Sequence, residues 1–241
     1  RRSKLVINVN KIGRSDEEII EAINSDPTQL NIEELLYAGT LTEDLEEQLK
    51  YYSVAATQVP KCIRAHNNVG YSNLKLGNVA EAKAAFEKAQ AISNNDVVKN
   101  NLGAVALIEG DLEAAEELFT SMTSSTPTST FGLGTIALVR GEYDKAVNYF
   151  GTEASTNNAL ALILKGDLSK AKVMLDGMEM CKCGTPSYVK AVVGARMDDK
   201  DYTLNSLREA VEFNADWKAY AAKDVEFAKF AEDEAFKAIV Q

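Results

Sequence analysis

A six-residue pattern that recurs four times limits the possible folds of this chain more than any other feature. Each copy has glycine, a polar residue, an apolar residue, two further residues and alanine, and the copies begin at Gly77, Gly110, Gly141 and Gly166. Glycine readily adopts the left-handed conformation that ends a helix. Asparagine or aspartate follows it in three copies and is a preferred helix N-cap, whereas Glu142 is a poor one. The pattern therefore predicts a tight turn between two helices, with the apolar residue and alanine beginning the buried stripe of the second.

The spacing of apolar residues around these turns predicts a series of helix pairs. The expected pairs cover residues 63–76 with 79–92, 96–109 with 112–122, 128–140 with 143–150, 156–165 with 168–176, and 187–197 with 200–213. Earlier in the chain, a capping box that begins at Ser15 predicts a helix to about Asn24. Two more helices are expected before residue 60, one capped by Asn31 and one opened by Thr42.

The two ends of the chain depart from this pattern. Residues 3–9 have the β-branched character and weak alternation of a short strand. After Asn214 the period stops, and an aromatic-rich segment predicts short helices divided at Asp224 and Asp233. Helix pairs stacked in a row, an arrangement called a solenoid, need an atypical end unit to cover the last apolar face. We therefore interpret residues 215–241 as a cap.

Equivalent positions in the first helices repeat at a nearly constant interval. If Leu36, Gly70, Gly103, Gly134, Ala159 and Ala191 are equivalent, the intervals are 34, 33, 31, 25 and 32 residues. A period near 34 with two helices per unit resembles the tetratricopeptide repeat, or TPR. In this resemblance these small residues mark the close crossing of two helices. The second-helix alanine matches Ala82, Ala115, Ala146 and Ala171, and the later large position matches Tyr52, Phe86, Phe119, Phe150, Leu175 and Leu207.

The resemblance implies an all-α, right-handed solenoid of helical hairpins, with about six helix pairs. We expect an N-terminal extension over residues 1–28, the solenoid over 29–214 and the helical cap over 215–241. The 25-residue interval indicates one trimmed pair, so the solenoid is expected to bend or tighten near residues 151–158. In the last pair Asp198 stands where the turn glycine is expected, which leaves the register there open by one residue.

Composition narrows the possible partners and locations. The 241 residues include 36 acidic and 26 basic side chains, a net charge of −10, and show no basic cluster, so nucleic acid is not an expected partner. No apolar run is long enough for a transmembrane helix. The chain opens on Arg1 and Arg2 without methionine or a signal-peptide pattern, which suggests a piece excised from a longer protein.

The residues that usually carry catalysis are scarce. His66 is the single histidine, so neither a multi-histidine metal site nor a Ser-His-Asp triad is expected, and we predict no catalytic, cofactor-binding or metal-binding residues. The run from Met178 to Cys183 is the one unusual cluster. Its thiols and thioethers could hold a soft ion such as Cu(I) or form a redox pair, or the run could be a packed loop between helix pairs.

A TPR superhelix lines its concave face with the first helices, so the resemblance implies that their exposed residues meet a partner. Asn68, Asn101 and Asn157 lie in equivalent register, and such amides can pair with the backbone of an extended peptide. The row is interrupted by Gly132 and Glu34. The complete set of candidate partner-binding residues is Asn68, Asn101, Asn157, Asn67, Asn100, Tyr71 and Arg64. An alternative interpretation treats these asparagines as polar packing residues.

We therefore expect a non-catalytic protein–protein interaction scaffold that binds a peptide or helix of a partner protein in its concave groove. The alternative is a structural spacer within a larger bacterial envelope protein, without a groove ligand. That alternative rests on the possible upstream strand and on resemblance to TPR domains of envelope proteins, which would place the chain in the periplasm or at the outer membrane. A cytoplasmic location is the other possibility, and the oligomeric state and partner identity are left open.

Overall fold

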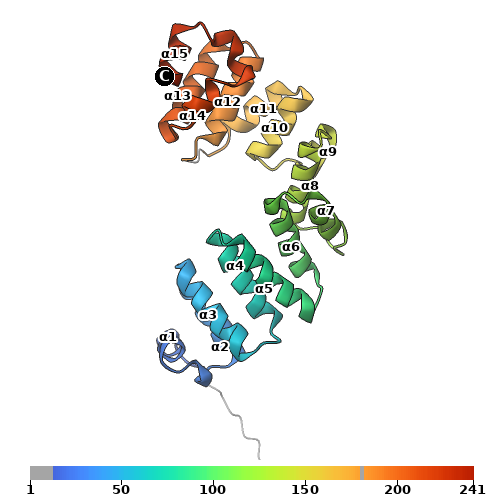
Figure 1. The fold of residues 1–241 in the computed structure, drawn as a ribbon, viewed down its shortest axis with the longest axis vertical. Coiled ribbons are helices and arrows are strands. Elements are labelled where there is room, and N and C mark those ends of the chain that lie inside the picture. Colours follow the sequence, from blue (N-terminus) through green and yellow to red (C-terminus); the bar gives the residue numbers. More distant parts are fainter. Residues whose placement is uncertain (1–12, 180–181) are drawn as a thin grey trace, which may run out of the picture. The chain divides into compact units, whose positions relative to one another are not determined.

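The computed structural model describes residues 13–179 and 182–241, and every regular element in these ranges is a helix (Figure 1). The strand expected at residues 3–9 lies outside the described part. The chain divides into two compact units, Arg1–Ser124 and Ser125–Gln241, which we call unit 1 and unit 2. Within the two described ranges, no helix is both long and apolar enough to cross a membrane.

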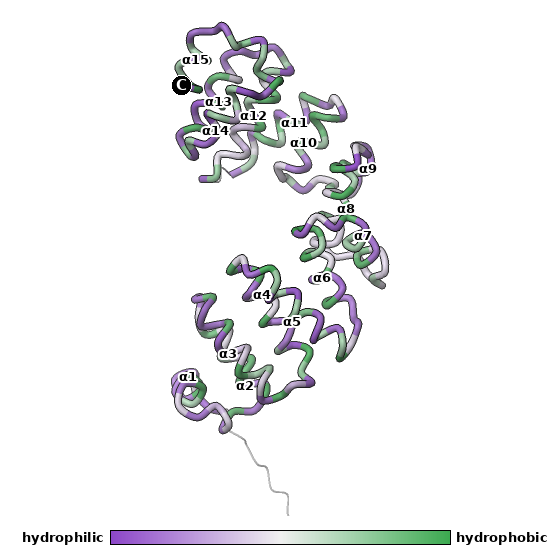
Figure 2. Tube along the Cα trace, in the orientation of Figure 1, coloured by the Kyte–Doolittle hydropathy of each residue, from purple (hydrophilic) through white to green (hydrophobic). Residues whose placement is uncertain are grey.

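Unit 1 consists of an N-terminal helix followed by three helix pairs. Its elements are α1 (Asp16–Ser25), a 3-10 turn η1 (Pro27–Gln29), α2 (Ile32–Ala38) with α3 (Leu45–Gln58), α4 (Ile63–Lys75) with α5 (Val79–Ile92), and α6 (Asp96–Glu109) with α7 (Leu112–Thr120). Hydrophobic and hydrophilic stretches alternate along α4 and α5, as amphipathic helices require (Figure 2). The expected boundary at Thr42 is wrong. The Asp44 carboxylate accepts the backbone N–H groups of Glu46 and Glu47, so it caps α3 instead.

Unit 2 consists of three further pairs and a terminal set of short helices. Its elements are α8 (Pro127–Val139) with α9 (Tyr143–Phe150), α10 (Thr156–Lys165) with α11 (Leu168–Asp176), α12 (Thr185–Arg196) with α13 (Lys200–Phe213), and then α14 (Trp217–Ala221), the 3-10 helix η2 (Val225–Phe230) and α15 (Glu234–Val240). Helix α12 begins two residues earlier than expected because Pro186 is tolerated in its first turn. Asp224 and Asp233 cap η2 and α15, which confirms the division expected there.

The turns between paired helices depend on left-handed residues. Gly77, Gly110, Gly141 and Gly166 all have φ between 77° and 97°, as expected. Asp198 takes their place before α13 with φ of 59°, which aspartate tolerates better than most residues.

The capping expected after these glycines is only partly correct. Asp111 accepts the backbone N–H of Ala114, whereas Asn78 and Asp167 make no such bond. The Asn78 amide instead donates to Asn73, and the Asp167 carboxylate binds Lys170. These side chains satisfy nearby polar groups and leave the first turn of the following helix without a side-chain cap.

In three helix pairs a glycine of the first helix lies against a phenylalanine of the second. An added Cβ at Gly70, Gly103 or Gly134 would lie 2.6 Å from a ring carbon of Phe86, Phe119 or Phe150, respectively. The rings are buried, so each lies directly on the backbone of the neighbouring helix. The first pair differs. Its Tyr52 ring lies against Gly39. The repeat interval had predicted this contact three residues earlier, at Leu36.

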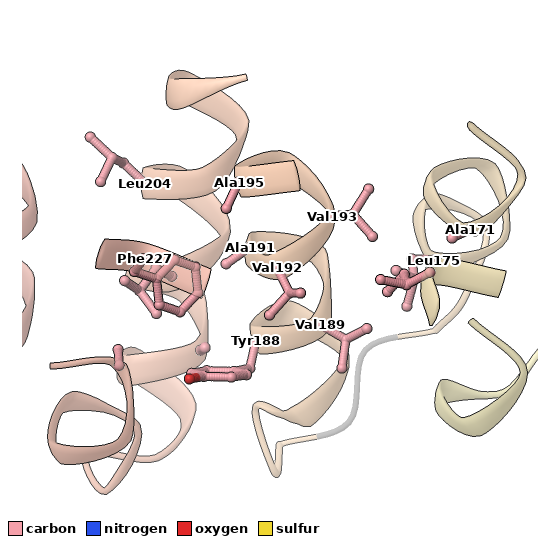
Figure 3. Close-up of a cluster of buried hydrophobic side chains, with 14 of the residues drawn as sticks. Ala171, Leu175, Tyr188, Val189, Ala191, Val192, Val193, Ala195, Leu204 and Phe227 are labelled. Carbon is pink, nitrogen blue, oxygen red and sulfur yellow. The ribbon is translucent and has the colours of Figure 1, made fainter. Parts of the chain in front are cut away.

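The largest core lies in unit 2 around α12. Val189 and Val193 of α12 face Leu175 of α11, while Tyr188 lies on the side of Phe227 (Figure 3). Tyr188 stacks on Trp217 with ring centroids 4.3 Å apart, and its hydroxyl donates to Asp224 at 2.6 Å. The aromatic segment after residue 214 therefore packs directly on the last helix pair.

Candidate interaction surface

The candidate partner-binding residues of unit 1 lie on its first helices. Helix α4 carries Arg64, Asn67, Asn68 and Tyr71, and α6 carries Asn100 and Asn101. We call the exposed side of α2, α4 and α6 the first-helix face. Gly70 and Gly103 lie against Phe86 and Phe119 of the second helices, so Asn68 and Asn101, two positions before them, lie on the opposite side of their helices.

An ion pair joins α2 to α4 on this face. The guanidinium of Arg64 donates two hydrogen bonds to the Glu33 carboxylate, one of them at 3.0 Å and one shorter. Hydrogen bonding from Arg64 lowers the pKa of Glu33 below its usual value. Both side chains are largely exposed, so solvent screens their attraction. The pair orients two side chains and leaves their outer edges open to solvent.

Two asparagines join α4 to α6. The Asn101 amide donates to the Asn67 carbonyl oxygen at 2.7 Å, and the Asn100 amide donates to the Asn101 oxygen at 3.2 Å. Both polar ends of Asn101 are therefore bonded within the chain. Asn68 is partly buried, and its side chain forms no hydrogen bond with the residues that the structure describes. Within unit 1, Asn68 is thus the row member whose amide is free for another molecule.

Exposed aromatic side chains complete the first-helix face. Tyr71 is 49% exposed, and the Lys75 ammonium lies 5.5 Å from its ring centroid. Tyr37 of α2 is 45% exposed and donates to Asp16 at 3.1 Å. Sequence analysis did not single out Tyr37, although it stands one 34-residue interval before Tyr71. The repeat spacing was therefore the signal that could have found it.

The third asparagine of the row belongs to unit 2. Asn157 lies on α10, and its amide donates to the Thr135 hydroxyl on α8 at 3.2 Å. It therefore ties two first helices of unit 2, much as Asn101 does in unit 1. The structure brings Asn68 and Asn101 into one unit and Asn157 into the other.

The remaining chemical candidates have other surroundings. A ring nitrogen of His66 lies 2.9 Å from the Pro60 carbonyl oxygen, so this side chain fastens the loop before α4. Cys62 is a free cysteine, and Met180 and Cys181 of the sulfur-rich run lie outside the described residues. Across residues 13–179 and 182–241, histidine, cysteine, aspartate and glutamate form no group of three that could hold a metal ion.

Comparison with protein-family models matches one of the helix pairs. Residues 63–96, which include α4 and α5, match the family model described as Tetratricopeptide repeat. A comparison with curated protein sequences finds no match.

Several solved structures resemble the whole chain. One is the crystal structure of the APC/C hetero-tetramer Cut9-Hcn1, with a TM-score of 0.73 and 15% identity over 93% of this chain. This chain spans 45% of the length of that relative. A tetratricopeptide repeat protein from Parabacteroides merdae ATCC 43184 has a TM-score of 0.64 and 15% identity, covering 94% of this chain and 91% of the other. Pseudomonas aeruginosa pilF has a TM-score of 0.62 and 15% identity, covering 91% and 99%.

At such low identity these structures establish the fold, while the family match identifies the repeat itself. The turn glycines, the glycine–phenylalanine contacts and the helix pairs explain both the structural similarity and the family match. Residues 63–96 are thus a tetratricopeptide repeat, and the chain as a whole has the fold of tetratricopeptide-repeat proteins.

Proposed function

We propose that this protein is a non-catalytic scaffold that binds a segment of a partner protein on the first-helix face of unit 1. The TPR fold suggests protein–protein interaction, and repeat proteins generally use it without catalysis. The observation that carries the proposal is the combination of the free amide of Asn68 with the exposed ring of Tyr71 on one helix. An aromatic ring supplies a large apolar contact, and an amide can pair with a peptide backbone.

The neighbouring contacts support this proposal by holding the surface in place. Arg64 of α4 orients Glu33 of α2, and the partly buried Asn101 and Asn67 join α6 to α4. A surface whose side chains are already ordered loses less conformational entropy when a partner binds. Each repeat is also packed against its neighbours before any partner arrives. We expect binding to order the partner segment more than the scaffold.

Site-specific photo-crosslinking tests this proposal. A benzophenone amino acid is placed at Tyr71 on the first-helix face or, as a control, at the exposed Lys88 on α5. The proteins are then irradiated in lysate of the source organism, and the crosslinked peptides are identified by mass spectrometry. We expect one partner segment to be labelled from position 71 and not from position 88.

The opposite pattern would reject the first-helix face. Labelling from Lys88 alone would place the interface on the second helices. No specific labelling from either position would favour the spacer function. Thermal melts monitored by circular dichroism provide the folding control for both labelled proteins.

A further inference from the structure

Unit 2 contains an open pocket that the proposed function does not use. It has a volume of about 680 Å³, and residues of α9, α10 and α11 line it. This volume lies within the range of small-molecule sites in proteins. All of its lining residues belong to unit 2, so its shape is set within one compact unit.

The pocket lies where two second helices are short. Helices α9 and α11 have 8 and 9 residues, whereas α5 and α13 have 14 each. Gly151 ends α9 with φ of 59° and ψ of −127°, a conformation almost confined to glycine. The last turns of a full-length helix are therefore missing beside α10. The trimmed pair that the 25-residue interval indicated is the pair that opens this space.

A buried amide holds the wall of the pocket in shape. The Asn158 side chain is fully buried, and its amide donates to the carbonyl oxygens of Gly151 and Glu153 at 3.2 and 2.9 Å. These bonds fasten the loop between α9 and α10. One wall of the pocket is thus held by hydrogen bonds to the backbone.

The interior of the pocket is apolar. Val147, Leu162 and Met174 line it and also belong to or pack against the main core of unit 2. Val173 lines it too and is 75% exposed, which is unusual for a valine on a pocket wall. An aliphatic chain that covered these side chains would remove apolar surface from water.

Two lysines supply the ammonium groups of the pocket. Lys165 and Lys170 line it together with Asp167, and each ammonium group is paired with one carboxylate. Lys165 contacts the exposed Asp144 at 2.8 Å, and Lys170 contacts Asp167 at 3.2 Å. Exposed ion pairs of this kind contribute little, so both ammonium groups can turn to an incoming carboxylate at small cost.

We propose that this pocket binds a free aliphatic carboxylate. Its hydrocarbon chain lies against Val147, Leu162, Val173 and Met174, and its carboxylate pairs with Lys165 and Lys170. The C-terminus of an apolar peptide offers the same chemistry, so the test separates the two sources. This binding is independent of the partner surface on unit 1, because no residue is shared between them.

Isothermal titration calorimetry with dodecanoate below its micelle concentration tests the proposal. Val173→Glu places a negative charge at the pocket, and Lys165→Gln with Lys170→Gln removes the two positive charges. We expect each variant to bind about fivefold more weakly than the wild type, which is the size of effect that exposed charge contacts can have. Val139→Glu introduces the same charge at an exposed valine of α8, and Lys218→Gln with Lys223→Gln makes the same charge change elsewhere. Both controls should bind within about twofold of the wild type.

Three further results would overturn the proposal. The first is the absence of dodecanoate binding by the wild-type protein. The second is equal binding of dodecanol, which has the same chain without the carboxylate. The third is binding of a peptide with a free C-terminal Leu-Leu sequence in place of dodecanoate, which would assign the pocket to a partner protein. Thermal melts establish that every variant is folded. Because Val173 is exposed, Val173→Glu is expected to fold like the wild type.

Discussion

Replacing Asn158 with aspartate is expected to lower the free energy of unfolding of unit 2 by about 3 kcal/mol or more at pH 7. The two side chains have nearly the same shape, so packing is preserved. The wild-type amide donates to two backbone carbonyl oxygens, and its own oxygen has no donor. A carboxylate at this fully buried position would face those carbonyl oxygens without any donor or positive partner. Urea denaturation of the two proteins measures the loss.

This loss is expected to depend on pH in a defined direction. Burial and the facing carbonyl oxygens raise the folded-state pKa of the introduced carboxyl group above its unfolded value of about 3.9. The folded variant therefore binds a proton more tightly than the unfolded chain, so its stability relative to wild type is greatest below about pH 4 and falls as pH rises from there through the folded pKa. Asn148→Asp, on the exposed side of α9, is the control and should change stability by less than about 0.5 kcal/mol. Equal losses for the two substitutions would contradict the role given to Asn158.

Replacing Gly70 with alanine is expected to destabilise unit 1 by about 1–3 kcal/mol, even though alanine is the better helix former. The new methyl group would lie 2.6 Å from Cδ1 of Phe86, well inside contact distance. Phe86 is fully buried, so its ring cannot withdraw without disturbing the core. The gain in helix propensity, about 1 kcal/mol, is too small to offset this overlap.

A double-mutant cycle tests the origin of that loss. In a Phe86→Leu background the smaller side chain leaves room for the added methyl group, so Gly70→Ala should cost less than it does in the wild type. Thermal and urea denaturation of the four proteins provide the comparison. An identical cost in both backgrounds would mean that the glycine serves some purpose other than close helix packing.

The fold could be predicted from the sequence because its signals are local and repeated. A left-handed glycine next to a polar residue marks a turn without reference to the rest of the chain, and the 34-residue spacing then places the helices on both sides. The errors occur where a side chain could choose between partners. Asn78 binds Asn73 rather than its own helix, and Asp44 rather than Thr42 begins α3. Sequence alone does not weigh such competing hydrogen bonds.

The candidate site was harder to predict from the sequence, because its side chains also have competing hydrogen-bond partners. Repeat register placed Asn68, Asn101 and Tyr71 on first helices, and the structure has them on α4 and α6. Repeat register did not indicate that the Asn101 amide would donate a hydrogen bond to Asn67, because that bond depends on the spacing of two helices. The unit 2 pocket could not be predicted from the sequence either. The short interval indicated a trimmed pair, but the volume that it opens depends on three-dimensional packing.

The most direct test of the proposed function is the affinity of the segment crosslinked from Tyr71, made as a synthetic peptide. Fluorescence anisotropy compares the wild type with an Asn68→Ala and Tyr71→Ala double variant, and neither side chain forms a hydrogen bond among residues 13–179 and 182–241. Asn101 is left unchanged because its amide holds α4 to α6. A matched Lys88→Ala variant on α5 is the control. The account predicts that the double variant binds about tenfold more weakly or worse while the control binds like wild type. Equal affinity of all three proteins would contradict binding on the first-helix face.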